Sequence, residues 1–413
     1  MPDEIKRAAD ALRGEAPSDA VRNLPEVKIF GHRSRRSKPG NVDGDHPVLG
    51  RELPQYQAPD AAVGRDAVDQ DERLTGTGLL DRDQWWHGDI VPGFNWGMPD
   101  TADPFLINTK EQASDGSFKR QESRFRNWVT ADGSSRFTPE TGRYHLYVCR
   151  ACPWAHRTLI GRALMGLEDA ISVSFVDPVR DARGWAFTGG EYHDQANGFK
   201  FLSEAYVRTD SEFDDRVTVP VLWDKHMGVI VNNESSEILR MLSTVFAPLS
   251  VHPVELYPSA LAEEIDALSE YFYNPVNNGV YRAGFATTQG AYEEAVAELF
   301  RVLDELDEQL ASRRFLLGTQ HPVESDWRLF TTLVRFDAVY QIHFKCSLRK
   351  LAEYPRLWPY LRDLYQWPGV RQTTSFQEIR DHYYKTHGAI NPTGIVAAMP
   401  ALDFDEPHGR EAL

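Results

Sequence analysis

The chain has 413 residues, a length that allows two or three domains with substantial cores. Hydrophobic residues make up 41% of it, and no run of about 18 apolar residues occurs that would predict a transmembrane helix. The formal net charge of −16 argues against binding to nucleic acid or to anionic membranes, because both depend on clustered Lys and Arg. The first twenty residues lack a continuous apolar stretch, so we expect a cytoplasmic protein without a secretory signal.

The first part of the chain differs in composition from the rest. Residues 1–80 are rich in Pro, Gly, Asp and Arg and have no sustained hydrophobic period, which predicts a polar, disordered extension apart from a short helix near 3–13. A basic run at 32–38 is short and isolated, and we interpret it as a solvated tail. Aromatic residues return at 84–97, where we expect packing on a folded body.

The middle of the chain alternates strand and helix patterns. Residues 143–149 alternate and are rich in β-forming residues, and Pro153 then suits the first turn of a helix. Strands are predicted at 171–178 and 216–224, and a strand, a polar turn and a helix follow in 228–242. This order is typical of a thioredoxin-like domain, a small mixed sheet with helices on both faces. We assign it to residues 81–250, including an N-terminal lead-in.

From about residue 258 the pattern becomes helical. Apolar residues recur with the 3.6-residue period of an amphipathic helix at Tyr292, Val296, Leu299, Leu303, Leu306 and Leu310. Residues 326–340 are almost entirely apolar and predict a buried helix, and 358–370 predict another. The predicted fold class is therefore an α/β thioredoxin-like domain followed by an all-α helical domain at 251–413.

The three cysteines of the chain allow a metal site, a redox pair or a single nucleophile. Cys149 and Cys152 lie in the stretch "YVCRACPWAHRT", and Cys346 follows His343. A structural zinc site needs four ligands, usually in two close pairs. The stretch "HFKCSL" at the end of a buried helix does not resemble a zinc-binding loop, so we expect no metal.

The position of Cys152 favours a nucleophile. Cys152 directly precedes Pro153 at the start of the predicted helix, where unpaired backbone N–H groups and the helix dipole stabilise a thiolate. A dithiol enzyme would carry a second Cys at position 155, which is Ala155 here. The sequence thus predicts a monothiol site, with Cys149 as a packed residue at the end of the strand.

Two further motifs suit the binding of a thiol peptide. The stretch "TVPV" at 218–221 fits the strand whose proline is cis in thioredoxin-like folds, which leaves the backbone of Val219 free to pair with an extended peptide. The stretch "NNESSEI" puts Glu234 and Ser235 at the start of a helix, where backbone N–H groups bind a carboxylate and Glu can bind an ammonium group. Together these features would hold a γ-glutamyl group.

Several long motifs in this order resemble the glutathionyl-hydroquinone reductases, the Xi-class glutathione transferases. The motifs are "CPWAHRTLI", "TVPVLWD", "NNESSEI", "NNGVYRAGFATTQ", "DWRLFTTLVRFDAVY", "HFKC" and "INPTGIV". The resemblance runs from about residue 118 to the C-terminus. It implies a glutathione transferase fold, a homodimer, and a cysteine that removes glutathione from glutathionyl-hydroquinones.

The resemblance also implies roles for individual residues. By motif, Cys152 is the nucleophile, and the glutathione-contacting residues are Trp185, Val219, Glu234 and Ser235. Tyr281 and one tyrosine of "HYYKTH", Tyr383 or Tyr384, face the aromatic substrate. We take Tyr281 and Tyr384 as the catalytic hydroxyls, which donate to the quinol oxygens and favour the tautomer from which the C–S bond breaks most easily.

The chain departs from the family pattern at three points. Cys149 stands where relatives usually have a hydroxyl residue, and the N-terminal extension is longer than usual. The hydroxyl expected to cap the helix at 326 is replaced by Val323, so we expect that helix to begin with Ser325 or Asp326 as its cap.

The expected reaction needs no bound cofactor. The Cys152 thiolate attacks the sulfur of an aryl thioether and becomes glutathionylated, and a second thiol then regenerates it. Glutathione or γ-glutamylcysteine would serve as the thiol co-substrate. Two alternatives stay open: an Omega-like thioltransferase or dehydroascorbate reductase that uses the same cysteine, and a non-enzymatic scaffold that kept the glutathione transferase fold.

Overall fold

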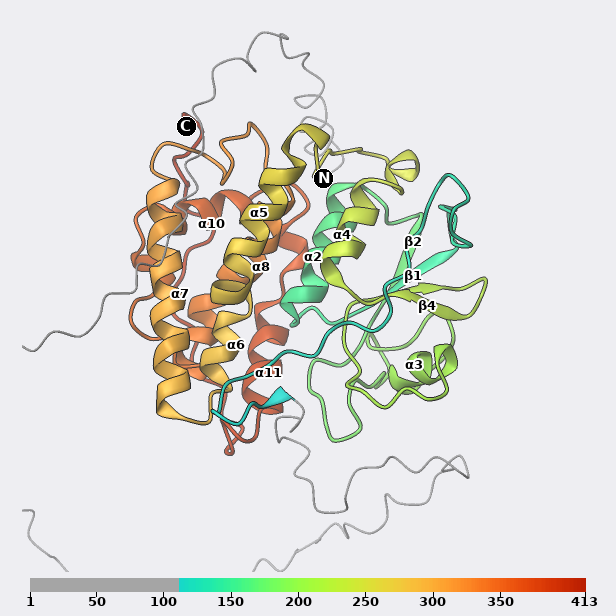
Figure 1. The fold of residues 1–413 in the computed structure, drawn as a ribbon, viewed down its shortest axis with the longest axis horizontal. Coiled ribbons are helices and arrows are strands. Elements are labelled where there is room, and N and C mark those ends of the chain that lie inside the picture. The colour runs from blue at the N-terminus through green and yellow to red at the C-terminus, as the bar shows by residue number, and fades with distance from the viewer. Residues whose placement is uncertain (1–110) are drawn as a thin grey trace, which may run out of the picture. The chain divides into compact units, whose positions relative to one another are not determined.

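The computed structural model describes residues 111–413, which form part of one compact unit (Figure 1). The predictions made for residues 1–80 and for the aromatic segment 84–97 lie outside this range.

A mixed four-stranded sheet forms the first half of the described chain. The strands are β1 (Tyr144–Val148), β2 (Ile171–Phe175), β3 (Val221–Asp224) and β4 (Val229–Asn232), in the order β2-β1-β3-β4. β1 pairs in parallel with β2 and antiparallel with β3, and β3 pairs antiparallel with β4. All five residues of β1 are buried, as expected for a central strand covered on both faces. The predicted thioredoxin-like domain is confirmed.

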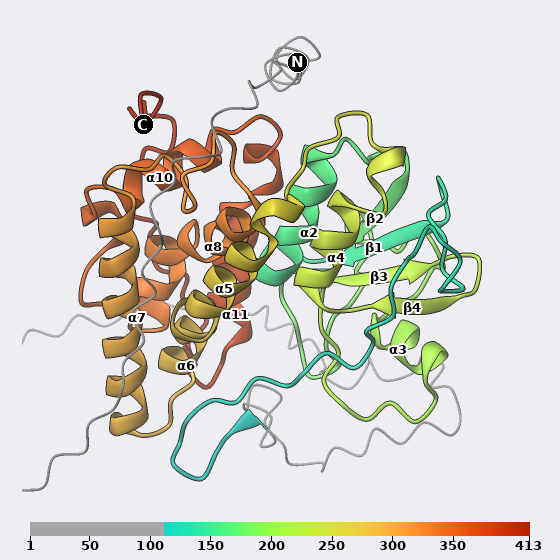
Figure 2. The ribbon, with the colours of Figure 1, turned by 45° about the horizontal axis from the view of Figure 1, so that its top comes forward.

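Three helices accompany the sheet: α2 (Pro153–Leu164), α3 (Ser203–Thr209) and α4 (Ser235–Ser243). α2 and α4 pack against each other and both contact the helical half through α8 (Glu324–Leu333), whereas α3 packs on β4 (Figures 1 and 2). Gly161 of α2 allows this close approach, because a Cβ there would lie 2.6 Å from a methyl carbon of Leu239 on α4.

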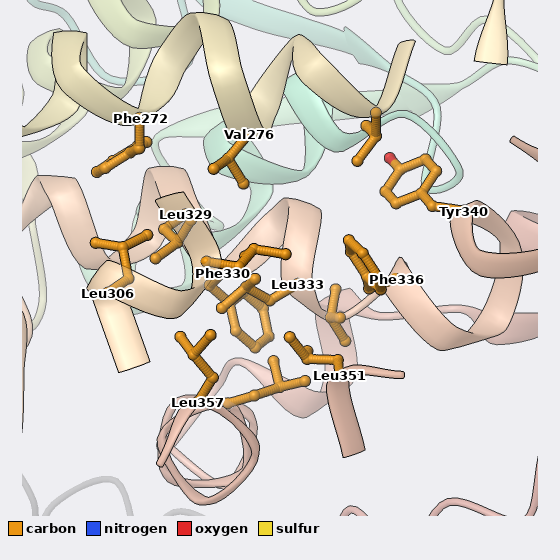
Figure 3. Close-up of a cluster of buried hydrophobic side chains, with 14 of the residues drawn as sticks. Phe272, Val276, Leu306, Leu329, Phe330, Leu333, Phe336, Tyr340, Leu351 and Leu357 are labelled. Atoms are coloured by element: carbon orange, nitrogen blue, oxygen red, sulfur yellow. The ribbon is translucent and has the colours of Figure 1, made fainter. Parts of the chain in front are cut away.

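The second half is helical, as predicted. Besides α8 it contains α5 (Ala262–Phe272), α6 (Gly279–Gly284), α7 (Gln289–Gln309), α9 (Gln341–His343), α10 (Leu357–Tyr365) and α11 (Phe376–Thr386). The apolar faces of these helices meet in one core that includes Phe272, Leu306, Phe330 and Leu357 (Figure 3). Within residues 111–413, no helix is both long and apolar enough to cross a membrane.

The prediction of one continuous helix at 326–340 is wrong. α8 ends at Leu333, a wide π-type turn covers Phe336–Tyr340, and the short α9 follows. The side chain of Arg335 explains the break: its Nη1 donates to the carbonyl of Thr331 at 2.7 Å, and that carbonyl would otherwise accept the Arg335 backbone N–H of a regular helix. The Arg335 N–H donates to Thr332 instead.

The helix start at position 326 relies on Asp326. Its carboxylate accepts the backbone N–H groups of Val323 at 2.9 Å and Leu316 at 3.0 Å, and the hydroxyl of Tyr360 at 2.8 Å. The hydroxyl of Ser325 is buried and has no partner among the described residues. α8 therefore begins at Glu324 with Val323 as its N-cap, and of the two residues expected to support this start it is Asp326, in the first turn, whose side chain bonds back to the N-cap backbone.

The strand predicted at 216–224 is shorter than expected. The peptide bond between Val219 and Pro220 is cis, as the sequence indicated, and β3 begins only at Val221. Pro220 has no N–H to donate to a ladder, so regular pairing starts after it. Residues 216–219 instead form part of a cavity wall.

Candidate active site

One cavity joins the two halves of the described chain. Its walls carry the expected nucleophile together with aromatic and basic side chains. They are Phe118, Arg120, Cys152, Pro153, Trp154, Arg180, Trp185, Arg216, Val217, Thr218, Val219, Tyr281, Phe285, His382 and His387. The sequence predicted eight residues at the site, and four of them line this one cavity. They are Cys152, Trp185, Val219 and Tyr281.

Cys152 occupies the N-cap of α2, with Pro153 as the first helical residue. Its backbone is extended, and its Sγ lies 3.6 Å from the carbonyl oxygen of Val219. The side chain is 9% exposed, and that exposure opens into the cavity. The geometry therefore presents a thiol at a helix N-terminus beside the backbone of Val219, as the sequence predicted.

The other two cysteines have a different environment. Cys149 and Cys346 are fully buried and unpaired, and burial raises the pKa of both thiols far above the ordinary value. Cys149 follows β1 and its carbonyl accepts the N–H of Cys152 at 3.1 Å. In residues 111–413, no group of three or more His, Cys, Asp or Glu side chains has a spacing that suits a metal ion.

Arg335 holds the turn that precedes Cys152. Its Nε donates to the carbonyl of Ala151 and its Nη2 to that of Arg150, each at 2.9 Å, while Nη1 lies 3.0 Å from Nδ1 of His156. The guanidinium is completely buried. It therefore connects the helical half to the turn that positions the thiol, although no local sequence pattern singles it out.

Trp185 forms one aromatic wall of the cavity. Its ring stacks on that of His382, with centroids 5.3 Å apart and planes 18° apart, and the Arg180 guanidinium lies 4.8 Å from its centre. The indole is 5% exposed. A flat side chain held in this way suits contact with an extended peptide.

Glu234 and Ser235 lie at the N-terminus of α4, outside the cavity lining. The Glu234 carboxylate accepts the Ser123 hydroxyl at 2.9 Å and the Ser236 backbone N–H at 3.3 Å, so it caps the helix. Ser235 is buried and accepts from Nη1 of Arg157 at 3.4 Å. Both residues therefore have structural contacts in addition to any contact with a ligand.

Three tyrosine hydroxyls form a chain that begins at the cavity. The Tyr281 hydroxyl lies 2.6 Å from that of Tyr383, which in turn lies 2.9 Å from that of Tyr340. Burial raises the pKa of all three phenols, so they remain protonated donors at neutral pH. The sequence does not predict a site role for Tyr340, because a single tyrosine in an apolar stretch is typical of a buried core residue.

The structure distinguishes Tyr383 from Tyr384, although the roles predicted for them remain predictions. The Tyr384 hydroxyl is buried without a partner among the described residues, and its ring contacts that of His343. Consecutive residues of a helix point about 100° apart, so only one of the pair can face Tyr281, and it is Tyr383.

The cavity is basic. Arg120, Arg180 and Arg216 contribute guanidinium groups to its wall, and Arg216 is paired with Glu111, whose carboxylate accepts from it at 2.7 Å. Burial lowers the pKa of Arg216 to about 10, and Nη2 of Arg120 and Nε of Arg180 are buried without a hydrogen-bond partner among the described residues. Desolvated cations of this kind favour an anionic ligand.

Comparison with known proteins agrees with the class that the fold and cavity define. The profile described as "Glutathione S-transferase, N-terminal domain" matches residues 151–245, and "Glutathione S-transferase, C-terminal domain" matches 289–363. The glutathionyl-hydroquinone reductase YqjG of Escherichia coli K12 is 50% identical over 309 residues, which cover 73% of this chain and 94% of YqjG. The glutathionyl-hydroquinone reductase PcpF of Sphingobium chlorophenolicum is 47% identical over 292 residues, which cover 70% of this chain and 92% of PcpF.

Solved structures give the same result. The Xi-class glutathione transferase of Natrialba magadii is 52% identical, with a TM-score of 0.71 over 74% of this chain and 94% of that one. The glutathione-bound structure of Escherichia coli YqjG has a TM-score of 0.68 and 50% identity, over 70% of this chain and 96% of that one. The chain therefore belongs to the glutathionyl-hydroquinone reductases, the Xi-class glutathione transferases.

Proposed function

We propose that this protein removes glutathione from glutathionyl-hydroquinones through a mixed disulfide on Cys152. The observation that carries the proposal is the shared cavity: a thiol at a helix N-terminus and the Tyr281 hydroxyl line the same walls. Relatives that bear the name of this activity are 47–50% identical to the chain, which supports the same conclusion.

The thiol peptide would lie along the backbone of Val219, with its sulfur at Cys152. Glu234 and the start of α4 would receive the γ-glutamyl group, since the helix N-terminus favours a carboxylate and Glu234 an ammonium group. Glutathione is the co-substrate that the glutathione-bound structure of a relative supports. γ-Glutamylcysteine presents the same γ-glutamyl group and is expected to bind by the same contacts.

The aromatic group would lie on the side of Tyr281. When the thiolate attacks the thioether sulfur, the ring carbon must leave with an electron pair, which is unfavourable unless charge on the ring is neutralised. Tyr281 can donate a hydrogen bond to a quinol oxygen, and Tyr383 and Tyr340 polarise that hydroxyl through their own hydrogen bonds. The second thiol then attacks the mixed disulfide and releases the Cys152 thiolate.

The proposal includes an assembly and a location. By resemblance to its family the chain would act as a homodimer in the cytoplasm, and it would use no metal or other bound cofactor. Size-exclusion chromatography with light scattering measures the oligomeric state directly. A monomer that retains full activity would contradict the proposed homodimer.

Replacement of Tyr281 by Phe tests the aromatic side. We expect Tyr281→Phe to slow the reductive cleavage of a glutathionyl-hydroquinone by about 10²-fold, because one hydrogen-bond donor to the developing charge is lost. Reduction of a simple glutathione disulfide by the same variant should change little, since no ring carbon leaves. Both rates are measured at saturating thiol.

Tyr384→Phe provides the matched control. This variant removes the Tyr384 hydroxyl, which lies next to Tyr383 in α11. That hydroxyl has no hydrogen-bond partner among the described residues. We expect wild-type rates in both assays. Equal losses of both activities in Tyr281→Phe would mean that Tyr281 is structural. Loss of hydroquinone activity in Tyr384→Phe alone would contradict the assignment of the aromatic side.

A further inference from the structure

Two histidines form a direct pair that connects the cavity wall to the helical half. Nδ1 of His387 lies 3.0 Å from Nε2 of His343, and the two rings are stacked with centroids 5.2 Å apart. His387 directly follows α11 and lines the cavity, whereas His343 ends α9 and does not. The bond between the rings uses Nδ1 of His387 and Nε2 of His343, so Nε2 of His387 and Nδ1 of His343 are the outer nitrogens of the pair.

The second histidine of the cavity, His382, has a fixed tautomer. Its Nδ1 lies 2.6 Å from the carbonyl oxygen of Pro178, and a carbonyl can only accept, so the proton is on Nδ1. Burial lowers the pKa of His382 to about 3, and the ring is neutral. Its Nε2 can accordingly accept a proton but has none to donate.

The His343–His387 pair, in contrast, has two equivalent arrangements. When His343 donates through Nε2–H, Nδ1 of His387 accepts and His387, which lines the cavity, carries its proton on Nε2. When His387 donates through Nδ1–H, its Nε2 is a bare acceptor. Burial lowers the pKa of both rings, that of His343 to about 4, so both arrangements are neutral. Three coupled transfers convert a donor at the cavity into an acceptor: His387 loses the proton on Nε2, one proton passes from His343 to His387, and Nδ1 of His343 gains one.

We propose that His343 and His387 form a proton relay that supplies the proton for the leaving ring carbon and recovers one from the incoming thiol. This proposal rests on the proposed function, which requires both proton transfers. Tyr281 retains the role of donating to a quinol oxygen, and His387 is the acid for carbon.

In the first step the thiolate of Cys152 attacks the thioether sulfur. An S–S bond forms, the C–S bond breaks, and its electron pair stays on the ring carbon, which takes the proton from Nε2 of His387. Nδ1 of His387 takes the proton from Nε2 of His343, and Nδ1 of His343 takes one from a solvent water. That water is left as hydroxide, which carries the negative charge that the Cys152 thiolate has lost. The pair is now in its second arrangement and is still neutral.

In the second step the thiol of glutathione gives its proton to the bare Nε2 of His387. The resulting thiolate attacks the glutathionyl sulfur of the mixed disulfide, and Cys152 leaves as the thiolate. The protons move along the pair in the opposite direction, Nδ1 of His343 returns its proton to the hydroxide formed in the first step, and the first arrangement returns. Over the cycle the aryl carbon exchanges sulfur for hydrogen, two glutathione sulfurs are oxidised to a disulfide, and no net proton is consumed.

The charged groups around the pair favour this neutral behaviour. Arg180 and Arg216 at the cavity and Lys345 after α9 disfavour an additional positive charge on the rings, and the neutral ring of His382 on α11 packs against His387. A relay that stays neutral avoids placing a buried imidazolium beside these cations.

The test measures the first step in isolation with the full-length protein. Enzyme is mixed rapidly with a glutathionyl-hydroquinone in the absence of free thiol, and the mixed disulfide on Cys152 is followed by mass. His387→Ala and His343→Gln should each slow this step by about 10²-fold. Added imidazole should restore much of the loss in His387→Ala. Formation of the same mixed disulfide from glutathione disulfide, which needs no proton on carbon, should be little changed.

His226→Gln is the control, because His226 is an exposed histidine between β3 and β4. It should match the wild type in every assay. If His387→Ala and His343→Gln retain the wild-type rate with the hydroquinone conjugate, the relay is excluded while the proposed function stands. If both variants lose the two reactions equally and imidazole restores neither, the pair is structural and the relay is again excluded. If the wild type forms no mixed disulfide from the conjugate, the proposed function fails first.

Discussion

Cys149 and Cys152 lie three residues apart but differ in what surrounds each sulfur. Cys152 opens into the cavity at the start of α2, whereas Cys149 is fully buried and burial strongly raises the pKa of its thiol. A thiol that remains protonated is a poor nucleophile, so the two residues are not interchangeable.

Replacement of Cys149 by Ser should therefore leave most of the activity. A serine adds a hydroxyl to an apolar site, and we expect a loss of about 1–3 kcal/mol in the free energy of unfolding without a comparable loss of kcat/KM. Urea unfolding and steady-state kinetics with a glutathionyl-hydroquinone measure the two effects. A hundredfold fall in kcat/KM with unchanged stability would show that Cys149 takes part in the reaction.

At the same scale, the sequence marks residues that a neighbouring proline or helix start singles out, and it does not mark residues whose role depends on distant contacts. Cys152 and Val219 are marked by the prolines that follow them, and the structure has the helix start and the cis peptide bond that those prolines predicted. Tyr383 and Tyr384 could not be separated, because only the helix phase decides which of them faces Tyr281. His387 and Arg335 carry no local sequence pattern at all, since their partners are distant in the chain.

Among the elements, the break between α8 and α9 is the least predictable feature and one of the most consequential. The hydrophobicity of residues 326–340 indicates that they are buried but does not show whether the helix is continuous. Its continuity depends on the hydrogen bond from the Arg335 side chain to the carbonyl of Thr331. The same arginine, Arg335, holds the turn before Cys152, so the irregular helix and the placement of the thiol have a common cause.

Arg335→Lys tests this link. Lysine keeps the charge but cannot reach the carbonyls of Arg150, Ala151 and Thr331 together, as the planar guanidinium does. We expect a loss on the order of 3 kcal/mol in the free energy of unfolding and a slower reaction of Cys152 with glutathione disulfide.

The matched control is Arg301→Lys on α7. Arg301 is exposed and pairs with Glu305 one turn along the helix, a contact worth little in water. It should leave stability and thiol reactivity nearly unchanged. An Arg335→Lys protein as stable and as reactive as this control would mean that the turn before Cys152 does not depend on the arginine.

For the molecule as a whole, the described chain buries an unusual set of neutral histidines. Burial lowers the pKa of His145 and His343 to about 4 and that of His382 to about 3, and it also lowers the pKa of His156 and His387. In the unfolded chain each would bind a proton below about pH 6.5.

Stability should therefore fall as the pH falls through the range from about 6.5 to about 4. The unfolded state binds more protons than the native state there, and each such proton costs about 1.4 kcal/mol per pH unit. Asp326, whose pKa burial raises to about 6, acts in the opposite direction, but it is outnumbered by the histidines. Thermal unfolding followed by circular dichroism at about pH 7 and about pH 5.5 checks the sign. An equal or higher Tm at the lower pH would contradict this account.

The proposed reaction depends on Cys152 taking glutathione from an aryl thioether. The most direct measurement is the intact mass of the protein after incubation with a glutathionyl-hydroquinone and no free thiol, with Cys152→Ser treated in parallel. We expect the wild type to gain the mass of one glutathionyl group on Cys152, to release the free hydroquinone, and to lose the added mass when glutathione is supplied. Cys152→Ser should gain nothing. An unmodified wild type with intact substrate, or the same gain of mass in Cys152→Ser, would contradict the account.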